Sequence, residues 1–209
     1  KSFTASEVAN GTMLTWVGTG GTDQGYVSKW YDQAGTNTAY QVDAKQGRVV
    51  KDGVQVLENG APAILPNGVD IALEMTSAIG GTGNLAIFAA YRAIDNSSYV
   101  ARKLSGGNLD AGRGNDRWYC ATDYGTINTP THPSTEVIGT YMYIGTAMTV
   151  HGNGALIDSA TATQQPTSTV MRLGRYIGGE GGTMSEIIFY ESDQTDNRKA
   201  LSICKWPFL

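Results

Sequence analysis

Pairs of Asp or Asn followed by Gly divide the first third of the chain into short segments. They occur at Asp52-Gly53, Asn59-Gly60 and Asn67-Gly68, and Gly152-Asn153-Gly154 repeats the pattern later. Asp, Asn and Gly tolerate the positive φ angles that a tight β-hairpin turn requires, so such pairs are a strong short-range hairpin signal. The pattern therefore predicts a fold of many short strands joined by tight turns.

Composition also favours an all-β chain. Charged residues make up 16% of the sequence, against a usual share of roughly 25%, and there are 27 glycines. At 209 residues the chain is long enough to bury a sizeable core and stays within the size of one β-sandwich. It contains no internal repeat and no low-complexity linker. We therefore predict a single domain over residues 1–209.

Charge excludes two classes of partner. The net charge is −4, whereas a nucleic acid or an anionic membrane surface attracts a basic patch. Lys and Arg are scattered, and no run of them resembles a phosphate-binding stripe. No apolar stretch approaches the roughly 18 residues of a membrane-spanning helix. We therefore expect neither nucleic acid nor membrane as a partner.

Periodicity locates the strands. Residues Asn84–Arg92 form the longest nearly continuous apolar run, which predicts a central strand covered on both faces. Residues 105–116 are expected to be a polar loop, and Ser192 or Asp193 to cap a short C-terminal helix. Residues 11–17 are expected to form a strand before a Gly-rich hairpin loop at 18–22. Other expected strands are 48–51, 54–57, 98–103, 117–120, 136–144, 147–150, 155–158, 170–175 and 181–190.

One further strand, residues 25–31, is expected to run into a tight turn. Tyr26, Ser28 and Trp30 alternate with the residues between them, as the two faces of a strand require. Asp32 and Asn37 can hydrogen-bond nearby backbone, so the strand should end there. Asp32 is accordingly expected to be a buried, turn-forming residue.

This stretch and the closing strand resemble one known family. The string V-S-K-W-Y-D-Q-A-G-x-N, with Trp30, Tyr31, Asp32 and Gln33 as its structural motif, is similar to a segment of LamG-like, concanavalin A-like domains. The closing string G-x-M-S-E-I-I-x-Y, at residues 182–190, is similar to their last strand. Such domains occur in bacteriophage tail and virion proteins, in secreted bacterial proteins and, more distantly, in arabinofuranosidase B. The resemblance implies an all-β, concanavalin A-like jelly-roll β-sandwich of two antiparallel sheets with a short C-terminal helix.

A glycoside hydrolase on this fold would need two carboxylates facing each other across a cleft. No pair stands at a short spacing on one expected strand, so no catalytic residue is assigned. Glu186, on the closing strand, is expected to pair with an arginine. The available carboxylates are Glu58, Glu74, Glu136, Glu180, Glu186, Asp32, Asp110, Asp116 and Asp123.

Histidines and cysteines give no catalytic or metal pattern. His132 and His151 lie in polar surroundings and are expected to be exposed, which disfavours a catalytic triad and zinc. We predict no cofactor and no metal, although the oxygen-rich loop at residues 108–116 leaves calcium open without the usual order of its ligands. Cys120 lies in a strand-like run and is expected to be a buried free thiol, with a disulfide to Cys204 left open.

A carbohydrate site needs exposed aromatic rings beside planar polar groups, because sugars present both C–H faces and hydroxyls. One part of the sequence supplies this mixture, and alternation along residues 117–120 leaves it open whether Trp118 or Tyr119 is core instead. The family's usual binding face, the concave side of a sheet, is implied by the resemblance alone. The candidate carbohydrate-binding residues are Tyr91, Arg92, Asp110, Arg113, Asn115, Asp116, Trp118 and Tyr119.

We therefore expect a non-catalytic recognition domain of a phage virion or tail fibre, which attaches to host-surface carbohydrate through multivalent display. Its location would be the virion, or otherwise extracellular. Its partners would be a host glycan or other virion proteins, with a homo-oligomer left open. Two alternatives remain at this point: a purely structural virion decoration or scaffold domain, and a glycoside hydrolase on the same fold.

Overall fold

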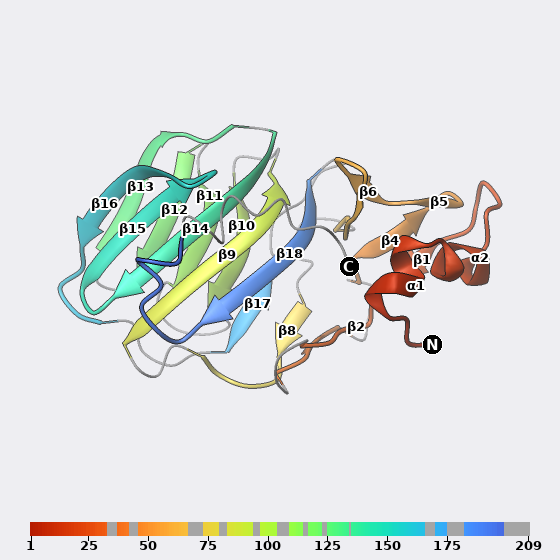
Figure 1. Cartoon of the computed structure of the whole chain (residues 1–209), viewed down its shortest axis with the longest axis horizontal. Coiled ribbons are helices and arrows are strands. Elements are labelled where there is room, and N and C mark those ends of the chain that lie inside the picture. The colour runs from red at the N-terminus through yellow and green to blue at the C-terminus, as the bar shows by residue number, and fades with distance from the viewer. Residues whose placement is uncertain are drawn as a thin grey trace.

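The computed structural model describes residues 1–32, 37–41, 46–66, 73–79, 83–93, 97–103, 109–114, 117–122, 125–133, 135–165, 170–174 and 182–198. Two large antiparallel sheets face each other and form a β-sandwich (Figure 1). Two short helices and a small sheet lie at one end of it. The predicted all-β, jelly-roll sandwich class is confirmed.

The first large sheet has the strand order β13-β12-β11-β10-β17-β8-β3-β2. The second has the order β16-β15-β14-β9-β18. The strands of the first are β2 (Lys29–Trp30), β3 (Ala39–Tyr40), β8 (Leu73–Met75), β10 (Ser97–Lys103), β11 (Asp110–Gly114), β12 (Arg117–Thr122), β13 (Gly125–Thr131) and β17 (Met171–Leu173). Those of the second are β9 (Asn84–Arg92), β14 (Glu136–Ile144), β15 (Ala147–Gly152), β16 (Ala155–Thr161) and β18 (Thr183–Tyr190).

The core lies between these two sheets, and β9 shows how the sequence forms it. One face of β9 carries Leu85, Ile87 and Tyr91 into the main core, and its other face packs Phe88 against Tyr190 of β18, with ring centroids 5.9 Å apart. β9 pairs with β14 on one side and β18 on the other. A strand buried on both faces reads as a continuous apolar run, so the prediction for this segment is confirmed.

Two glycines make room for large rings in this core. Gly139 of β14 and Gly152 of β15 stand opposite each other in the sheet. A Cβ added at Gly152 would lie 2.5 Å from the Trp118 ring, and one at Gly139 would lie 2.9 Å from the ring of Tyr91. Small residues on one sheet therefore admit large aromatic side chains from both sheets.

The hairpin turns behave as the sequence predicts. Asp52-Gly53 has φ angles of 53° and 74°, Asn59-Gly60 has 49° and 83°, and Asn153-Gly154 has 50° and 82°. Positive φ at both central residues is the mark of a type I′ turn, whose twist matches that of the flanking strands. The first two turns join β4 (Arg48–Lys51) to β5 (Val54–Gln55) and β6 (Leu57–Glu58) to β7 (Ala61–Pro62). Asn67-Gly68 lies outside the described residues.

The first expected strand is wrong, because residues 11–17 contain the helix α2 (Thr12–Val17). It follows α1 (Ala5–Ala9), which begins with a capping box: the Glu7 amide donates to Thr4 Oγ1, and the Thr4 amide donates to Glu7 Oε2. Gly11 and Gly18 adopt positive φ at the two ends of α2, which confines it to six residues. Residues 18–22 therefore connect a helix to a strand and do not form a hairpin loop.

Residues 25–31 are divided between two sheets, so the expectation of one strand is wrong. β1 (Gly25–Tyr26) pairs with β4 in a small sheet of order β1-β4-β5, whereas β2 pairs with β3 in the large sheet. Asp32 does form the expected turn, since its Oδ2 accepts from the Asn37 amide at 3.1 Å, but its side chain is exposed and not buried. Gln33 lies outside the described residues.

The structure also differs from the sequence-based expectation at strands β11 and β13, and it describes only the start of the expected C-terminal helix. Residues 110–114, expected within a loop, form strand β11, and strand β13 was not expected at all. Near the C-terminus, the Thr195 amide donates to Asp193 Oδ1 at 2.8 Å and the Arg198 amide donates to the Gln194 carbonyl at 2.8 Å, as at a helix start. The body of the predicted C-terminal helix lies outside the described residues. In the described part of the chain no helix has the length and apolar character to cross a bilayer.

Candidate ligand-binding cleft

The candidate residues from the sequence mostly lie inside the sandwich. Tyr91, Asp110, Arg113 and Trp118 are all buried, with at most 7% of their surface exposed. Tyr119 is half-buried. In this structure the rings of Tyr91 and Trp118 therefore present no surface on which a sugar could stack. Asn115 and Asp116 lie outside the described residues. Arg92 is half-buried and forms an ion pair with Glu58.

These buried side chains form a polar cluster around His132. The Tyr91 hydroxyl lies 2.6 Å from His132 Nε2 and also hydrogen-bonds the Tyr141 hydroxyl. The Trp118 ring packs against the imidazole at a tilt of 47°, with ring centroids 4.2 Å apart. Arg113 Nη1 donates to the carbonyl of Ala93 at 2.6 Å. Hydrogen bonding offsets the cost of burying these groups. The cluster therefore holds the two sheets in register as part of the core.

The expectation that both histidines are exposed is wrong. Burial lowers the pKa of His132 to about 4 and that of His151 to about 4, and in each case a nearby arginine contributes in the same direction. Both imidazoles are therefore neutral at physiological pH. Their burial depends on how strands β12 to β15 fold back on one another, which a histidine in a polar segment of sequence does not reveal.

Cys120 confirms its prediction as a buried free thiol. Burial raises its pKa to about 12, so the reactive thiolate is scarce near neutral pH. Cys204 lies outside the described residues. Within the described part of the chain, no three His, Cys, Asp or Glu side chains gather as metal ligands would.

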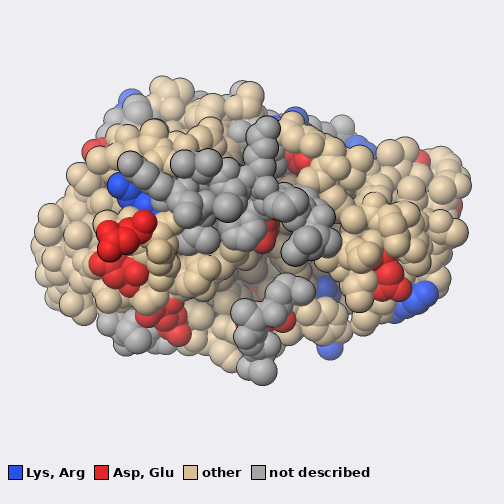
Figure 2. Space-filling view, in the orientation of Figure 1, with Lys and Arg blue, Asp and Glu red and all other residues tan. Residues whose placement is uncertain are grey.

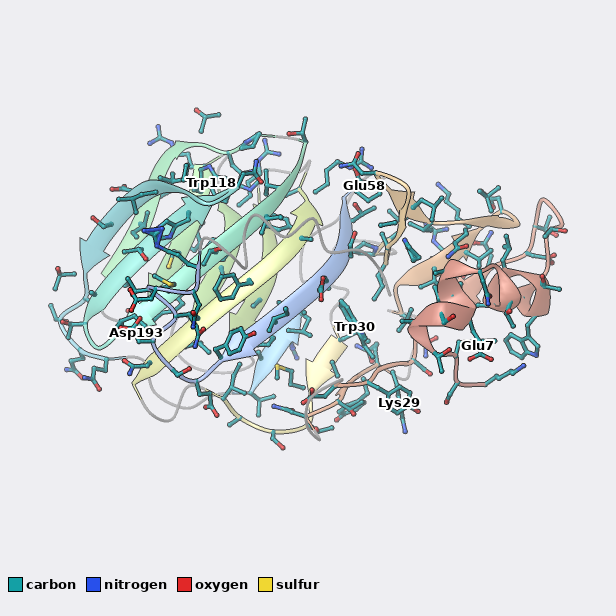
Figure 3. The ribbon with its side chains drawn as sticks, viewed as in Figure 1. Glu7, Lys29, Trp30, Glu58, Trp118 and Asp193 are labelled. Carbon is teal, nitrogen blue, oxygen red and sulfur yellow. The ribbon has the colours of Figure 1, made fainter. Side chains whose placement is uncertain are left out.

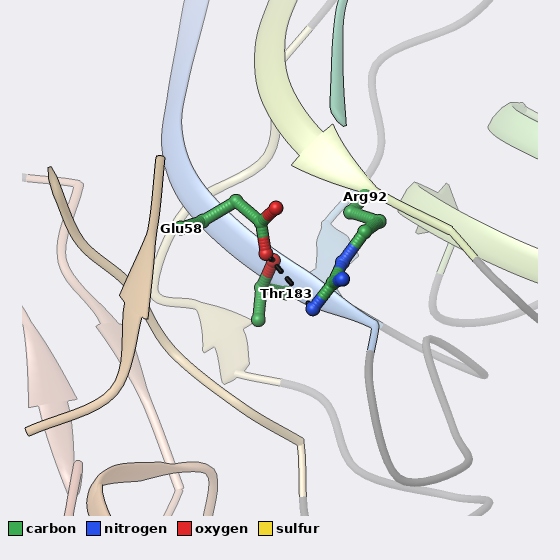
Figure 4. A network of polar contacts seen from close by, with 3 residues as sticks. All are labelled: Glu58, Arg92 and Thr183. Carbon is green, nitrogen blue, oxygen red and sulfur yellow. Dashed lines mark hydrogen bonds and ion pairs between the residues drawn. The ribbon is translucent and has the colours of Figure 1, made fainter. Parts of the chain in front are cut away.

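The described carboxylates are mostly tied to structural partners. Glu58 forms an ion pair with Arg92 at 3.0 Å and accepts a 2.7 Å hydrogen bond from Thr183 Oγ1 (Figure 4). Glu74 forms an ion pair with Arg172 at 2.8 Å. Glu186 has no ion pair among the described residues, contrary to expectation, and burial raises its pKa to about 7. Glu180, Asp116 and Asp123 lie outside the described residues, as does the side chain of Glu136.

A cleft of about 800 Å³ opens between the N-terminal helices and the edge of the sandwich at β18. One wall comes from residues 1–3, α1 and α2, and the other from residues 24–31 with Ile64, Met184 and Ser185. Figure 3 shows Trp30 and Lys29 on the segment that joins the helical end to the sandwich. Gln55 Nε2 donates to the Val8 carbonyl at 2.9 Å, which ties α1 to the small sheet and so fixes the first wall.

Five aromatic side chains line the described part of this cleft. Trp16 is 58% exposed, and Tyr26 and Tyr31 are each 48% exposed. The ring of Phe3 packs against that of Trp16 with centroids 5.5 Å apart, and Ser2 Oγ lies 3.4 Å from the Tyr31 hydroxyl. The aromatic residues in the lining are Phe3, Trp16, Tyr26, Trp30 and Tyr31. Two of them, Trp30 and Tyr31, belong to the family-like motif that the sequence marked as structural.

The cleft also has polar side chains and positive charge in its lining. Gln24 Nε2 donates to Asp52 Oδ1 at 2.6 Å, and Gln24 Oε1 is buried with no hydrogen-bond partner among the described residues. The same holds for Ser185 Oγ in the described part of the chain. The charged residues in the described lining are Lys1 and Lys29, with no Asp or Glu among them. Aromatic faces, polar atoms and a cation suit a polar ligand that has an apolar face.

Sequence reasoning missed this cleft. The candidates from the sequence came from β9 of one sheet and from the β11–β12 region of the other, whereas the cleft lining gathers segments from residue 1 to residue 185. Only one local signal was available, namely the aromatic residues concentrated near the N-terminus at Phe3, Trp16, Tyr26, Trp30 and Tyr31.

Comparison with known proteins bears on the fold. No protein-family model matches the chain, and no curated protein sequence matches it. Trypanosoma rangeli sialidase in complex with the inhibitor DANA superimposes with a TM-score of 0.63 at 11% identity, covering 87% of this chain and 32% of the sialidase. The binding domain of botulinum neurotoxin serotype D superimposes with a TM-score of 0.50 at 10% identity, covering 88% of this chain and 48% of that one.

The chain shares a jelly-roll β-sandwich fold with these structures. It spans about a third of the length of the sialidase that it resembles. At these identities the likeness describes the backbone architecture, and function has to be argued from the cleft.

Proposed function

We propose that this chain is a non-catalytic carbohydrate-recognition module that binds a glycan in the cleft between its N-terminal helices and the sandwich. The observation that carries the proposal is the set of five aromatic rings in the cleft lining. Trp16, Tyr26 and Tyr31 keep about half of their surface open to solvent. A sugar ring that stacks on such faces buries its C–H groups and leaves its hydroxyls free to hydrogen-bond.

Polar atoms in the same lining support a sugar over a purely apolar ligand. Ser2, Gln24, Ser28 and Ser185 supply hydroxyl and amide groups. Ser2 and Ser28 are exposed, so their hydroxyls are the ones that a sugar can reach directly, whereas Gln24 Oε1 and Ser185 Oγ are closed to solvent. A ligand with many hydroxyls suits a wall of this kind. A sialidase in complex with sialic acid shares the fold, which agrees with this ligand class.

The biological setting is proposed from the family resemblance. LamG-like domains occur in phage tail and virion proteins, and the net charge of −4 does not favour nucleic acid. The module would therefore act on a virion or tail fibre, outside the cell, with a host-surface glycan as its partner. A single shallow cleft binds weakly, so useful affinity would come from several copies displayed together, in a homo-oligomer or beside other virion proteins.

A structural role as a virion decoration or scaffold domain is the second candidate. Val54 and Leu57, on β5 and β6, are 66% and 50% exposed, and both lie on the N-terminal side of the molecule near the small sheet. Exposed apolar side chains are available for contact with another protein. This role requires no sugar in the cleft.

The test is a glycan array probed with the protein in multimerised form, with Trp16→Ala and Tyr31→Ala beside the original chain. Leu156→Ala is the matched control, because Leu156 is also 58% exposed but lies on β16, at the opposite edge of its sheet from β18. Loss of a stacking ring is expected to weaken binding about tenfold or more, whereas the control should bind unchanged.

Thermal unfolding of all four proteins shows whether the substitutions leave the fold intact. Silence of the folded protein across the array would reject glycan recognition and favour the structural role. Binding that survives both aromatic substitutions would reject the cleft as its site.

A further inference from the structure

We infer that the glycan bound in the cleft carries a carboxylate and that Lys29 is the residue that pairs with it. This inference rests on the proposed function. It adds an acidic saccharide as the ligand class and a named residue that distinguishes acidic from neutral sugars.

The charge of the cleft is opposite to that of the whole chain. The chain carries a net charge of −4, and on the face shown in Figure 2 the described Lys and Arg side chains lie singly among more numerous acidic ones. Yet the charged groups in the described cleft lining are Lys1 and Lys29 alone. A cleft of this sign attracts an anionic ligand and disfavours a cationic one.

The two lysines differ in their acidic neighbours: the pKa of Glu7 is lowered by its hydrogen bonds from Thr4 and also by the charge of Lys1, so Lys1 interacts with a carboxylate. Glu7 accepts from the Thr4 amide at 2.8 Å and from Thr4 Oγ1 at 2.9 Å. Asp23 accepts from the Gly20 amide at 2.8 Å, and Asp32 accepts from the Asn37 amide at 3.1 Å. Lys29 forms no ion pair with any residue in the described part of the chain.

The position of Lys29 suits a sugar stacked on the neighbouring rings. Lys29 is exposed and stands between Ser28 and Trp30, with Tyr31 next, and all four line the cleft. An ammonium group is a point charge with three donors, so it can hold a carboxylate at several angles. Lys1 is less available, because its ammonium lies 5.1 Å from the centre of the Phe3 ring. Lys29 is therefore the principal anion contact.

Two pairs of saccharides separate charge from sugar identity. Sialyllactose is compared with lactose, and oligogalacturonate with its neutral methyl ester, by isothermal titration calorimetry on the full chain. We expect the acidic member of at least one pair to bind about tenfold more tightly than its neutral partner, with the difference shrinking as salt is raised. Which pair responds tells whether the carboxylate belongs to a sialic acid or a uronic acid.

The variant is Lys29→Gln, and Arg117→Gln is the control, because it removes the same charge from an exposed site on β12. Lys29→Gln should abolish the preference for the acidic sugar and leave the weaker binding of the neutral one, while the control keeps the preference. Equal binding of acidic and neutral sugars by the original chain would overturn this inference. So would an equal effect of Lys29→Gln on both members of a pair.

The outcomes distinguish this inference from the proposed function. Binding that depends on Trp16 but ignores charge leaves glycan recognition standing and rejects the acidic ligand. Absence of binding to any of the four saccharides and to the array rejects both.

Discussion

At the scale of single residues, the ion pair between Glu58 and Arg92 joins strand β6 to the end of strand β9 (Figure 4). The Glu58 side chain is only 9% exposed and that of Arg92 is 34% exposed. Arg92→Met would leave the buried Glu58 carboxylate with the Thr183 hydrogen bond as its one remaining partner among the described residues. We expect a loss of about 2 kcal/mol in the free energy of unfolding, reduced from a fully buried pair because Arg92 meets solvent.

Urea denaturation measures this loss of stability, and two further variants serve as comparisons. Thr183→Val removes one hydrogen bond to the same carboxylate and should cost about 1 kcal/mol. Arg172→Met breaks the other ion pair, in which both side chains are 29% exposed, and should cost about 0.5 kcal/mol. If Arg92→Met costs no more than Arg172→Met, burial is not what makes the Glu58 pair important.

Single residues also show when the burial of a side chain can be predicted from the sequence. Cys120 was correctly expected inside because it sits in an apolar alternating run. His132 and His151 were not, since a polar stretch of sequence looks exposed until strands from elsewhere cover it. The partners of His132, Tyr91 and Trp118, come from strands of opposite sheets. The local sequence around a residue does not show which residues from distant strands will pack against it.

At the scale of elements, two turns of the same type provide a matched test. Gly53 and Gly60 both have positive φ, but a Cβ at Gly53 would lie 2.3 Å from the Gly20 carbonyl oxygen, whereas one at Gly60 would meet nothing within 4 Å. Gly60→Ala should therefore cost only the backbone penalty, about 1 kcal/mol. Gly53→Ala adds a collision with the loop at residues 18–20 and should cost about 3 kcal/mol.

Chemical denaturation of the two variants checks this difference. A second readout is hydrogen exchange of the Gly53 amide, which donates to the Asp23 carbonyl at 2.9 Å and should lose protection in Gly53→Ala. Similar stabilities for Gly53→Ala and Gly60→Ala would mean that the loop at residues 18–20 moves aside at little cost and does not stabilise the turn at Asp52-Gly53.

Elements were predictable where one local pattern decides them. Asp-Gly and Asn-Gly turns and the apolar run of β9 appear in the structure as the sequence predicts. Residues 11–17 were expected as a strand because their side chains suit either structure over so short a length. Glycines with positive φ at both ends, and packing of the buried Met13, select the helix. Competition between local preference and tertiary contact is strongest in such short segments.

At the scale of the whole molecule, the cleft explains why the site could not be read from the sequence while the fold class could. The all-β class follows from repeated local signals, namely alternation and turns, and the sandwich architecture from the family resemblance. By contrast, the cleft joins residues 1–31 to Ile64, Met184 and Ser185. The family-like strings at residues 27–37 and 182–190 contribute to its lining from opposite ends of the chain, through Trp30, Tyr31, Met184 and Ser185. The two strings lie close together only because of the order in which the strands are connected in the fold, which no local sequence pattern shows.

Three buried or half-buried groups give the whole molecule a predictable response to pH. Folding lowers the pKa of His132 and of His151 from 6.5 to about 4, so the unfolded chain takes up these protons first and stability falls as the pH drops from about 6.5 to about 4. Folding raises the pKa of Glu186 from 4.5 to about 7. Its contribution has the opposite sign: it is fully present below 4.5 and is lost as the pH rises through about 7.

Between about pH 4.5 and 6.5 the two histidines therefore outweigh the one glutamate, and the protein should become less stable on acidification. Glu186→Gln removes the opposing contribution, so its loss of stability towards acid should be steeper than that of the original chain. Urea midpoints across this range measure the slopes, with Glu191→Gln as the control because Glu191 is exposed just after β18. Parallel slopes for Glu186→Gln and the original chain would show that Glu186 ionises alike in the folded and unfolded states. A steeper slope in the control as well would assign the effect to net charge.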